Sequence, residues 1–134
     1  MKDLVLDKLL SVSVEEIDDD HRRLVSLFNI LNHAVAEGEP PEYLAAVLEE
    51  LINCTVWHFS HEERLMLRYG YQGMAEHKAD HAGLIESARE LQEKILQSGA
   101  HVADQDIVYL ERWLTEHILT ADMKLGEYLV MNME

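Results

Sequence analysis

Cysteine, proline and glycine are scarce in this sequence. Its 134 residues include one cysteine, Cys54, which excludes a disulfide within the chain and is typical of a reducing compartment. Both prolines and most of the six glycines gather at three breaks, EGEPPE (37–42), YGYQG (69–73) and QSGAH (97–101). Between the breaks, apolar residues recur with helical periodicity, and no alternating β pattern occurs. The sequence therefore predicts helices joined by short connections.

Positive charge and long apolar runs are lacking as well. The chain has 11 lysines and arginines against 26 acidic residues, a formal net charge of −15, which disfavours binding to nucleic acid or to an anionic membrane surface. No apolar run approaches the roughly 20 residues of a membrane span. The N-terminal segment also lacks the small-residue cleavage site of a signal peptide. We therefore expect a soluble cytoplasmic protein.

The pattern of helices and breaks predicts an all-α fold. Short connections favour antiparallel neighbours, so we expect an up-down-up-down four-helix bundle that forms a single domain over residues 1–134. An N-terminal extended arm is expected over 1–17 and a short C-terminal helix over 122–131. The acids that precede His21 suit a helix N-terminus. The four main helices are accordingly expected at 18–37, 41–68, 74–97 and 104–120.

Several histidines fall on the apolar faces of these helices. In the second helix the apolar stripe runs from Leu44 to Met66, and Glu62 falls near its centre. His58 lies within about 40° of that centre, whereas His61 lies about 100° away, at the flank. Histidines also share an apolar face on the other three helices: His21 on the first, His77 and His81 on the third, and His117 on the fourth.

A common partner explains this set better than separate structural roles. A single histidine on an apolar face is usually a core residue bonded to the backbone. An inward glutamate among five inward histidines is different, because a buried carboxylate is destabilising unless it is paired or bound to a metal. No lysine or arginine is expected to face inward, so the pattern predicts a metal. Asp122 lies five residues after His117, about 140° round an ideal helix. It can join His117 only if the helix ends or bulges between them.

Four motifs in this order resemble the hemerythrin family, specifically its single-domain bacterial members. They are IDDDH for the first histidine, HFSHEERLM for an H-x-x-x-E pair, HKADH for H-x-x-x-H, and HILTAD for H-x-x-x-x-D. Each motif alone is weakly specific, but their order, their spacing and the three breaks agree over essentially the whole chain. Two differences are that family members often have a tryptophan in the arm and a glycine in an SVG segment, where this chain reads LVLDKLLSVSV.

The resemblance implies a di-iron centre bridged by oxide or hydroxide. One iron would be held by His77, His81 and His117, and the other by His21 and His58, with Glu62 and Asp122 bridging the two. If both irons are octahedral, these ligands and the bridge leave one position open, on the iron with two histidines. In the family, O2 binds reversibly at that iron, and NO or small anions such as azide are further candidate ligands.

The resemblance therefore implies an oxygen carrier, store or delivery protein rather than an enzyme, with an unknown protein recipient. Only two of the seven ligands are anionic, whereas ferritin-like di-iron sites are rich in carboxylates, so the ferrous state should be accessible. The alternatives are an O2, NO or redox sensor that acts on a partner in trans, a di-iron peroxidase or oxidase, and an iron store.

Some other residues are expected to surround the centre. The candidate walls of the oxygen pocket are Leu24, Phe28, Trp113 and Leu114, for which ordinary core packing is an equally good interpretation. The acids that could hold imidazole N–H groups are Asp18, Asp19, Glu63 and Glu116. His33 and His101 are expected at the surface.

Overall fold

The computed structural model describes residues 11–98 and 104–133. Residues 1–10 of the predicted arm, and His101, lie outside the described residues. The described chain is helical almost throughout, in the order α1 (Glu15–Ala36), α2 (Pro41–Tyr69), α3 (Met74–Ser98), α4 (Asp104–His117), a π-helix (Ile118–Asp122) and α5 (Met123–Asn132). Within these ranges no helix combines the length and the apolar character of a membrane span.

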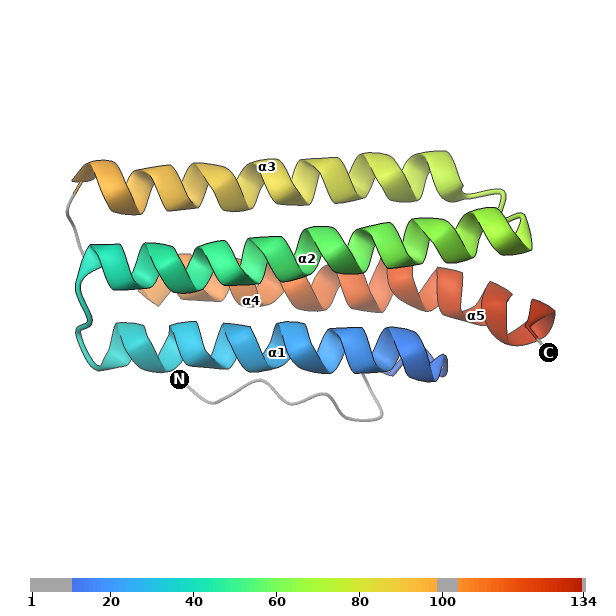
Figure 1. The fold of residues 1–134 in the computed structure, drawn as a ribbon, viewed down its shortest axis with the longest axis horizontal. Coiled ribbons are helices and arrows are strands. Elements are labelled where there is room, and N and C mark those ends of the chain that lie inside the picture. The colour runs from blue at the N-terminus through green and yellow to red at the C-terminus, as the bar shows by residue number, and fades with distance from the viewer. Residues whose placement is uncertain (1–10, 99–103, 134) are drawn as a thin grey trace.

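The helices α1 to α4 pack lengthwise as a bundle, and α5 extends it at the end of α4 (Figure 1). In Figure 1, α2 lies between α1 and α3, with α4 behind. Apolar side chains from the helices fill the centre, among them Phe28, Leu48, Ile52 and Leu110, each at most 1% exposed. The predicted all-α four-helix bundle is confirmed.

The fourth helix departs from the expected 104–120 at a bulge. α4 ends at His117, the π-helix follows directly, and α5 continues from Met123. A π-helix pairs each carbonyl with the N–H five residues later, so residues five apart lie closer to the same side than the roughly 140° of an α-helix allows. His117 and Asp122 have that spacing, and the bulge turns both side chains to the same side.

The first helix begins at Glu15, three residues before the predicted start at Asp18. The N–H groups of Ile17 and Asp18 bond to the carbonyl of Val14, so the helix starts without a side-chain cap. The Asp18 carboxylate instead accepts hydrogen bonds from the Val12 N–H (2.9 Å) and the Ser11 hydroxyl (2.6 Å). Asp18 thereby holds residues 11–14 against the start of α1. Within this segment Ser13 has a φ of 63°, a backbone conformation that favours glycine.

Val12 packs against α5 at Gly126. A Cβ atom built on Gly126 would lie 2.8 Å from the Val12 Cβ and closer still to the Val12 carbonyl oxygen. Val12 is 3% exposed, so neither group can move into solvent without losing its packing. Gly126 therefore allows the segment before α1 to lie directly on α5.

We expect Gly126→Ala to lower the free energy of unfolding by about 1–3 kcal/mol, the usual range for overpacking. Gly83 is the matched control, because it is also helical and a Cβ built there meets nothing within 4 Å. Gly83→Ala should be neutral or stabilising by up to about 1 kcal/mol, since alanine has the higher helix propensity. Urea unfolding of both variants, followed by circular dichroism, measures the difference. Equal stabilities would contradict the contact.

Candidate metal centre

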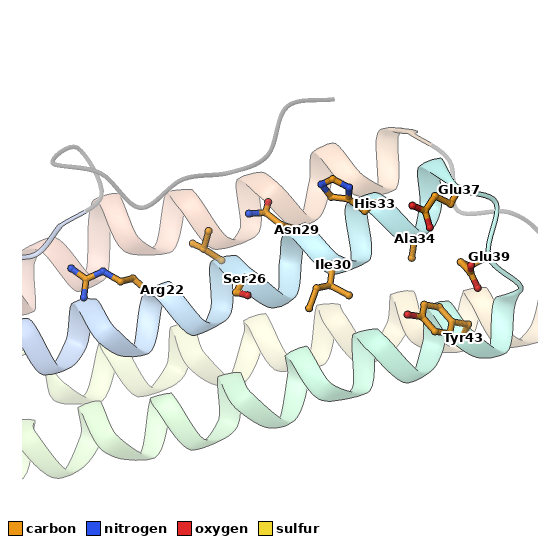
Figure 2. Close-up of a pocket in the computed structure, with 10 residues that line it drawn as sticks. Arg22, Ser26, Asn29, Ile30, His33, Ala34, Glu37, Glu39 and Tyr43 are labelled. Atoms are coloured by element: carbon orange, nitrogen blue, oxygen red, sulfur yellow. The ribbon is translucent and has the colours of Figure 1, made fainter.

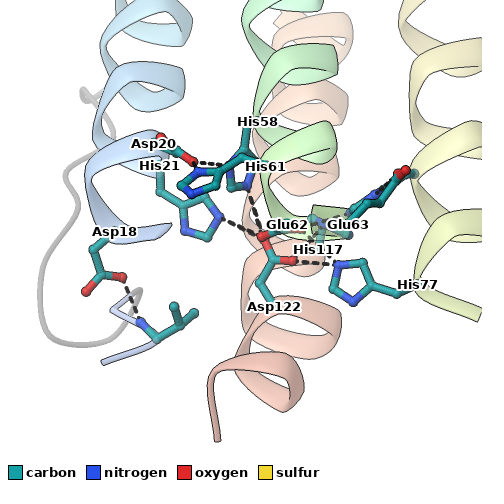
Figure 3. Close-up of polar contacts among 12 residues, drawn as sticks. Asp18, Asp20, His21, His58, His61, Glu62, Glu63, His77, His117 and Asp122 are labelled. Carbon is teal, nitrogen blue, oxygen red and sulfur yellow. Dashed lines mark hydrogen bonds and ion pairs between the residues drawn. The ribbon is translucent and has the colours of Figure 1, made fainter. Parts of the chain in front are cut away.

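The structure brings the seven predicted ligand side chains together in the interior of the bundle (Figure 3). They come from α1, α2, α3, α4 and the π-helix. None is more than 7% exposed, and four are fully buried. The seven are His21, His58, Glu62, His77, His81, His117 and Asp122.

Local helix geometry aims these side chains at one point. His58 and Glu62 are four residues apart on α2, and His77 and His81 have the same spacing on α3. Residues four apart lie on one face of an α-helix. Asp122 lies five residues after His117, and the π-helix brings its side chain to the same side as that of His117. The Asp122 Oδ1 atom then lies 3.0 Å from His117 Nε2.

The two carboxylates each divide their oxygens between two groups of histidines. Glu62 Oε1 lies 3.0 Å from Nε2 of both His77 and His81, while Oε2 lies 3.0 Å from His58 Nε2. Asp122 Oδ1 lies 3.0 Å from Nε2 of His77 and of His117, while Oδ2 lies 2.8 Å from His21 Nε2. The donor atoms thus form two groups that share Glu62 and Asp122.

The charges at the centre suit ligands of a metal cation. Burial raises the pKa of the Glu62 carboxyl, and the nearby Asp122 raises it further, but His58 and His21 outweigh both and hold it well below its usual range. Burial likewise raises the pKa of Asp122, but the close contacts with His117 and His21 outweigh it and hold this pKa well below the usual range. Burial lowers the pKa of His77, but hydrogen bonding to Asp122 and Glu62 prevails and raises it to about 9. Both carboxylates are therefore ionised at neutral pH, the form that binds metal, and a bound metal cation would take the place of the imidazole protons, because a histidine ligand is neutral.

Several donor atoms at the centre lack a hydrogen bond of good geometry. They are His58 Nε2, His117 Nε2, Glu62 Oε2 and Asp122 Oδ1. Buried polar atoms normally have partners, and no lysine or arginine is buried within the described residues. In each of the two groups, the donor atoms lie within 4.8 Å of one another. Imidazole and carboxylate donors in two such groups fit iron, which takes both ligand types.

Three acids support the ligand imidazoles from outside. The Nδ1 atom of His58 lies 2.9 Å from Asp20 Oδ2, that of His81 lies 3.3 Å from Glu63 Oε2, and that of His117 lies 2.6 Å from Asp80 Oδ2. Such contacts fix the ring so that Nε2 faces the centre.

Of the four acids predicted for this supporting role, only Glu63 contacts a ligand imidazole. Asp18 bonds to residues 11 and 12, and Asp19 and Glu116 pair with Arg22 and Arg112. Asp20 and Asp80 were missed. Both directly precede a ligand histidine in the sequence, which is a signal that could have indicated them.

Two other histidines lie in the described residues, His33 and His61, and both lie apart from the candidate ligands. His61 lies at the flank and contacts Asp20 (Figure 3), and Trp57 beside it is 54% exposed. His33 lines a surface groove of about 590 Å³ on α1, next to the connection to α2 (Figure 2). None of the seven ligand candidates lines that groove.

A small cavity adjoins the cluster, and its lining includes His21, His58 and His117. Three of the four predicted wall residues line it, namely Leu24, Trp113 and Leu114. Phe28 does not line it and packs in the core, 1% exposed. The cavity volume is about 10 Å³, close to the minimum that holds one water molecule. Only a very small ligand fits there.

Comparison with known proteins agrees with this geometry. Residues 12–129 match the Hemerythrin HHE cation binding domain. The bacteriohemerythrin of Pseudomonas paraeruginosa (strain PA7) is 36% identical over 122 residues, covering 91% of this chain and 78% of that protein. The bacteriohemerythrin of Methylococcus capsulatus is 33% identical over 112 residues, which cover 84% of this chain and 85% of that protein. A crystal structure of wild-type hemerythrin superposes with a TM-score of 0.84 at 29% identity, and the match covers 94% of this chain and 97% of that chain. The chain belongs to the hemerythrin family, a family of non-haem iron, oxygen-binding proteins.

Proposed function

We propose that this protein binds two iron atoms at the centre and binds O2 reversibly there, as a carrier, store or delivery protein. One iron would be held by His77, His81 and His117 and the other by His21 and His58, and Glu62 and Asp122 would be shared by the two. The observation that supports this assignment is the division of each carboxylate between the two groups of imidazoles. A bridging carboxylate needs one oxygen for each metal.

The side chains around the centre favour binding over turnover. Iron, when bound, supplies an open coordination position and the electrons for reversible O2 binding. The chain contributes an apolar surrounding, with Leu24, Leu114 and Ile118 in the wall of the cavity beside the cluster. The Thr55 hydroxyl in that wall donates to the Leu51 carbonyl at 2.6 Å. Apart from the ligands, no lining side chain in the described ranges offers an acid or base for a catalytic step.

The function predicts a reversible optical change. Protein loaded with ferrous iron under argon should gain a visible absorption band when air is admitted, and the band should vanish on degassing. The measurement is repeated over several cycles with the same sample. A band that decays directly to the ferric spectrum, or rapid consumption of added peroxide, would instead support an oxidase or peroxidase.

The ligand assignment predicts the metal content of variants. Glu62→Ala removes a bridging carboxylate, so purified protein should retain at most one iron per chain, and His58→Ala should do the same. Glu50 is an exposed acid on the same helix, so Glu50→Ala should keep the iron content of the unmodified chain. Iron is measured after gel filtration, and circular dichroism checks the fold. Unchanged iron in Glu62→Ala would reject the assignment.

A further inference from the structure

The supporting acids follow a regular order around the bundle. Asp20 on α1 contacts His58 on α2, Glu63 on α2 contacts His81 on α3, and Asp80 on α3 contacts His117 on α4. Each acid is the sequence neighbour of a ligand on its own helix. Neighbours on a helix point about 100° apart, so when the ligand faces the centre its neighbour faces the next helix.

The order is interrupted between α4 and α1. Neighbouring helices in the bundle run in opposite directions. The residue that faces the next helix therefore comes before the ligand in the sequence on α1 and α3, and after it on α2. The corresponding position on α4 follows His117 and is Ile118, which is fully buried. Within the described residues, His21 Nδ1 accordingly has no hydrogen-bond partner. Of the imidazoles on the side with two histidines, only that of His58 is supported by an acid.

Asp20 is itself held in place. Its side chain is 9% exposed, and its Oδ2 atom accepts hydrogen bonds from Nδ1 of His58 (2.9 Å) and from Nδ1 of His61 (2.5 Å). The His61 side chain is 11% exposed, and its ring lies 5.9 Å from that of Trp57. Asp80, in contrast, is 49% exposed where it contacts His117, so water can replace it.

We propose that Asp20, clamped by His61, is the positioning residue on which the metal held by His21 and His58 depends. The inference rests on the proposed di-iron function. The carboxylate keeps the His58 proton on Nδ1, so Nε2 faces the centre as a donor, and it makes that nitrogen more basic. A more basic ligand stabilises the ferric state more than the ferrous state. Asp20 thereby tunes the iron that has the open position.

Anaerobic titration of the metal-free protein with ferrous iron tests the proposal. Asp20→Asn keeps the shape of the side chain but loses its charge and one of its acceptor oxygens. We expect the second equivalent of iron to bind about 10–100-fold more weakly, the usual effect of losing such a partner, and the first to bind as before. Asp19→Asn is the matched control, because Asp19 is an exposed acid next to Asp20 that pairs with Arg22 away from the centre, and both equivalents of iron should bind to it as to the unmodified chain.

Two further measurements separate positioning from general stability. At saturating iron, Asp20→Asn should raise the midpoint potential of the centre, which a merely structural change would leave alone. In the metal-free protein, the low-field Nδ1 proton resonances of His58 and His61 should shift or disappear. If Asp20→Asn fails to fold, His61→Ala serves as the test, because it keeps the Asp20 contact to His58 and removes the clamp. His61→Ala should weaken the binding of the second equivalent of iron and leave that of the first unchanged.

The possible failures are distinguishable. Two equivalents bound by Asp20→Asn with unchanged affinities, or equal weakening of both, would overturn the role of Asp20 and leave the di-iron function intact. If His61→Ala binds the second equivalent of iron with unchanged affinity, the proposed role of His61 in holding Asp20 is wrong. Fewer than two equivalents bound by the unmodified chain would instead overturn the proposed function.

Discussion

Two buried carboxylates, Glu62 and Asp122, set the main constraint on this structure. Both are fully buried, and removing a charge from water is strongly unfavourable unless opposite charge and hydrogen bonds compensate it. The five imidazoles around them supply part of this compensation, and in the proposed function two metal ions supply the rest. A conventional apolar core occupies the remainder of the bundle, with Leu48, Ile52 and Leu110 almost completely buried. The fold therefore tolerates one costly polar cluster because apolar packing surrounds it.

The π-helix connects this constraint to the backbone. Without it, Asp122 would point away from His117, and the cluster would lose one of its two buried carboxylates. Because the helix resumes as α5, the same bulge also sets the direction of the C-terminal segment. α5 then packs on Val12 through Gly126 and bonds to the end of α2, where the Tyr128 hydroxyl donates to the Tyr69 carbonyl at 2.5 Å. The same π-helix thus places Asp122 in the centre and sets the direction in which α5 packs on Val12 and on the end of α2.

The parts of the molecule that depend on helical periodicity could be predicted from the sequence. Apolar spacing indicated the bundle and the inward direction of His58, Glu62, His77 and His81. Asp122 could not be placed in this way, because periodicity assumes an unbroken α-helix, and only the family resemblance indicated it. The start of α1 was predicted three residues late because the acids before His21 suit a first helical turn, whereas the Asp18 carboxylate bonds to residues 11 and 12. Asp20 was hidden among three consecutive acids, whose roles depend on which helix lies opposite.

The imidazole of His21 lies beside the cavity and has no supporting acid. His21 and Ile118 both line the cavity, and the Nδ1 atom of His21 has no partner in the described chain. A buried donor without a partner is destabilising by about 1–3 kcal/mol. An acid at position 118 would satisfy it but would put a charge, and with it water, in the cavity wall. Ile118 keeps that part of the wall apolar, and His21 Nδ1 is left without the acid that supports three of the other imidazoles.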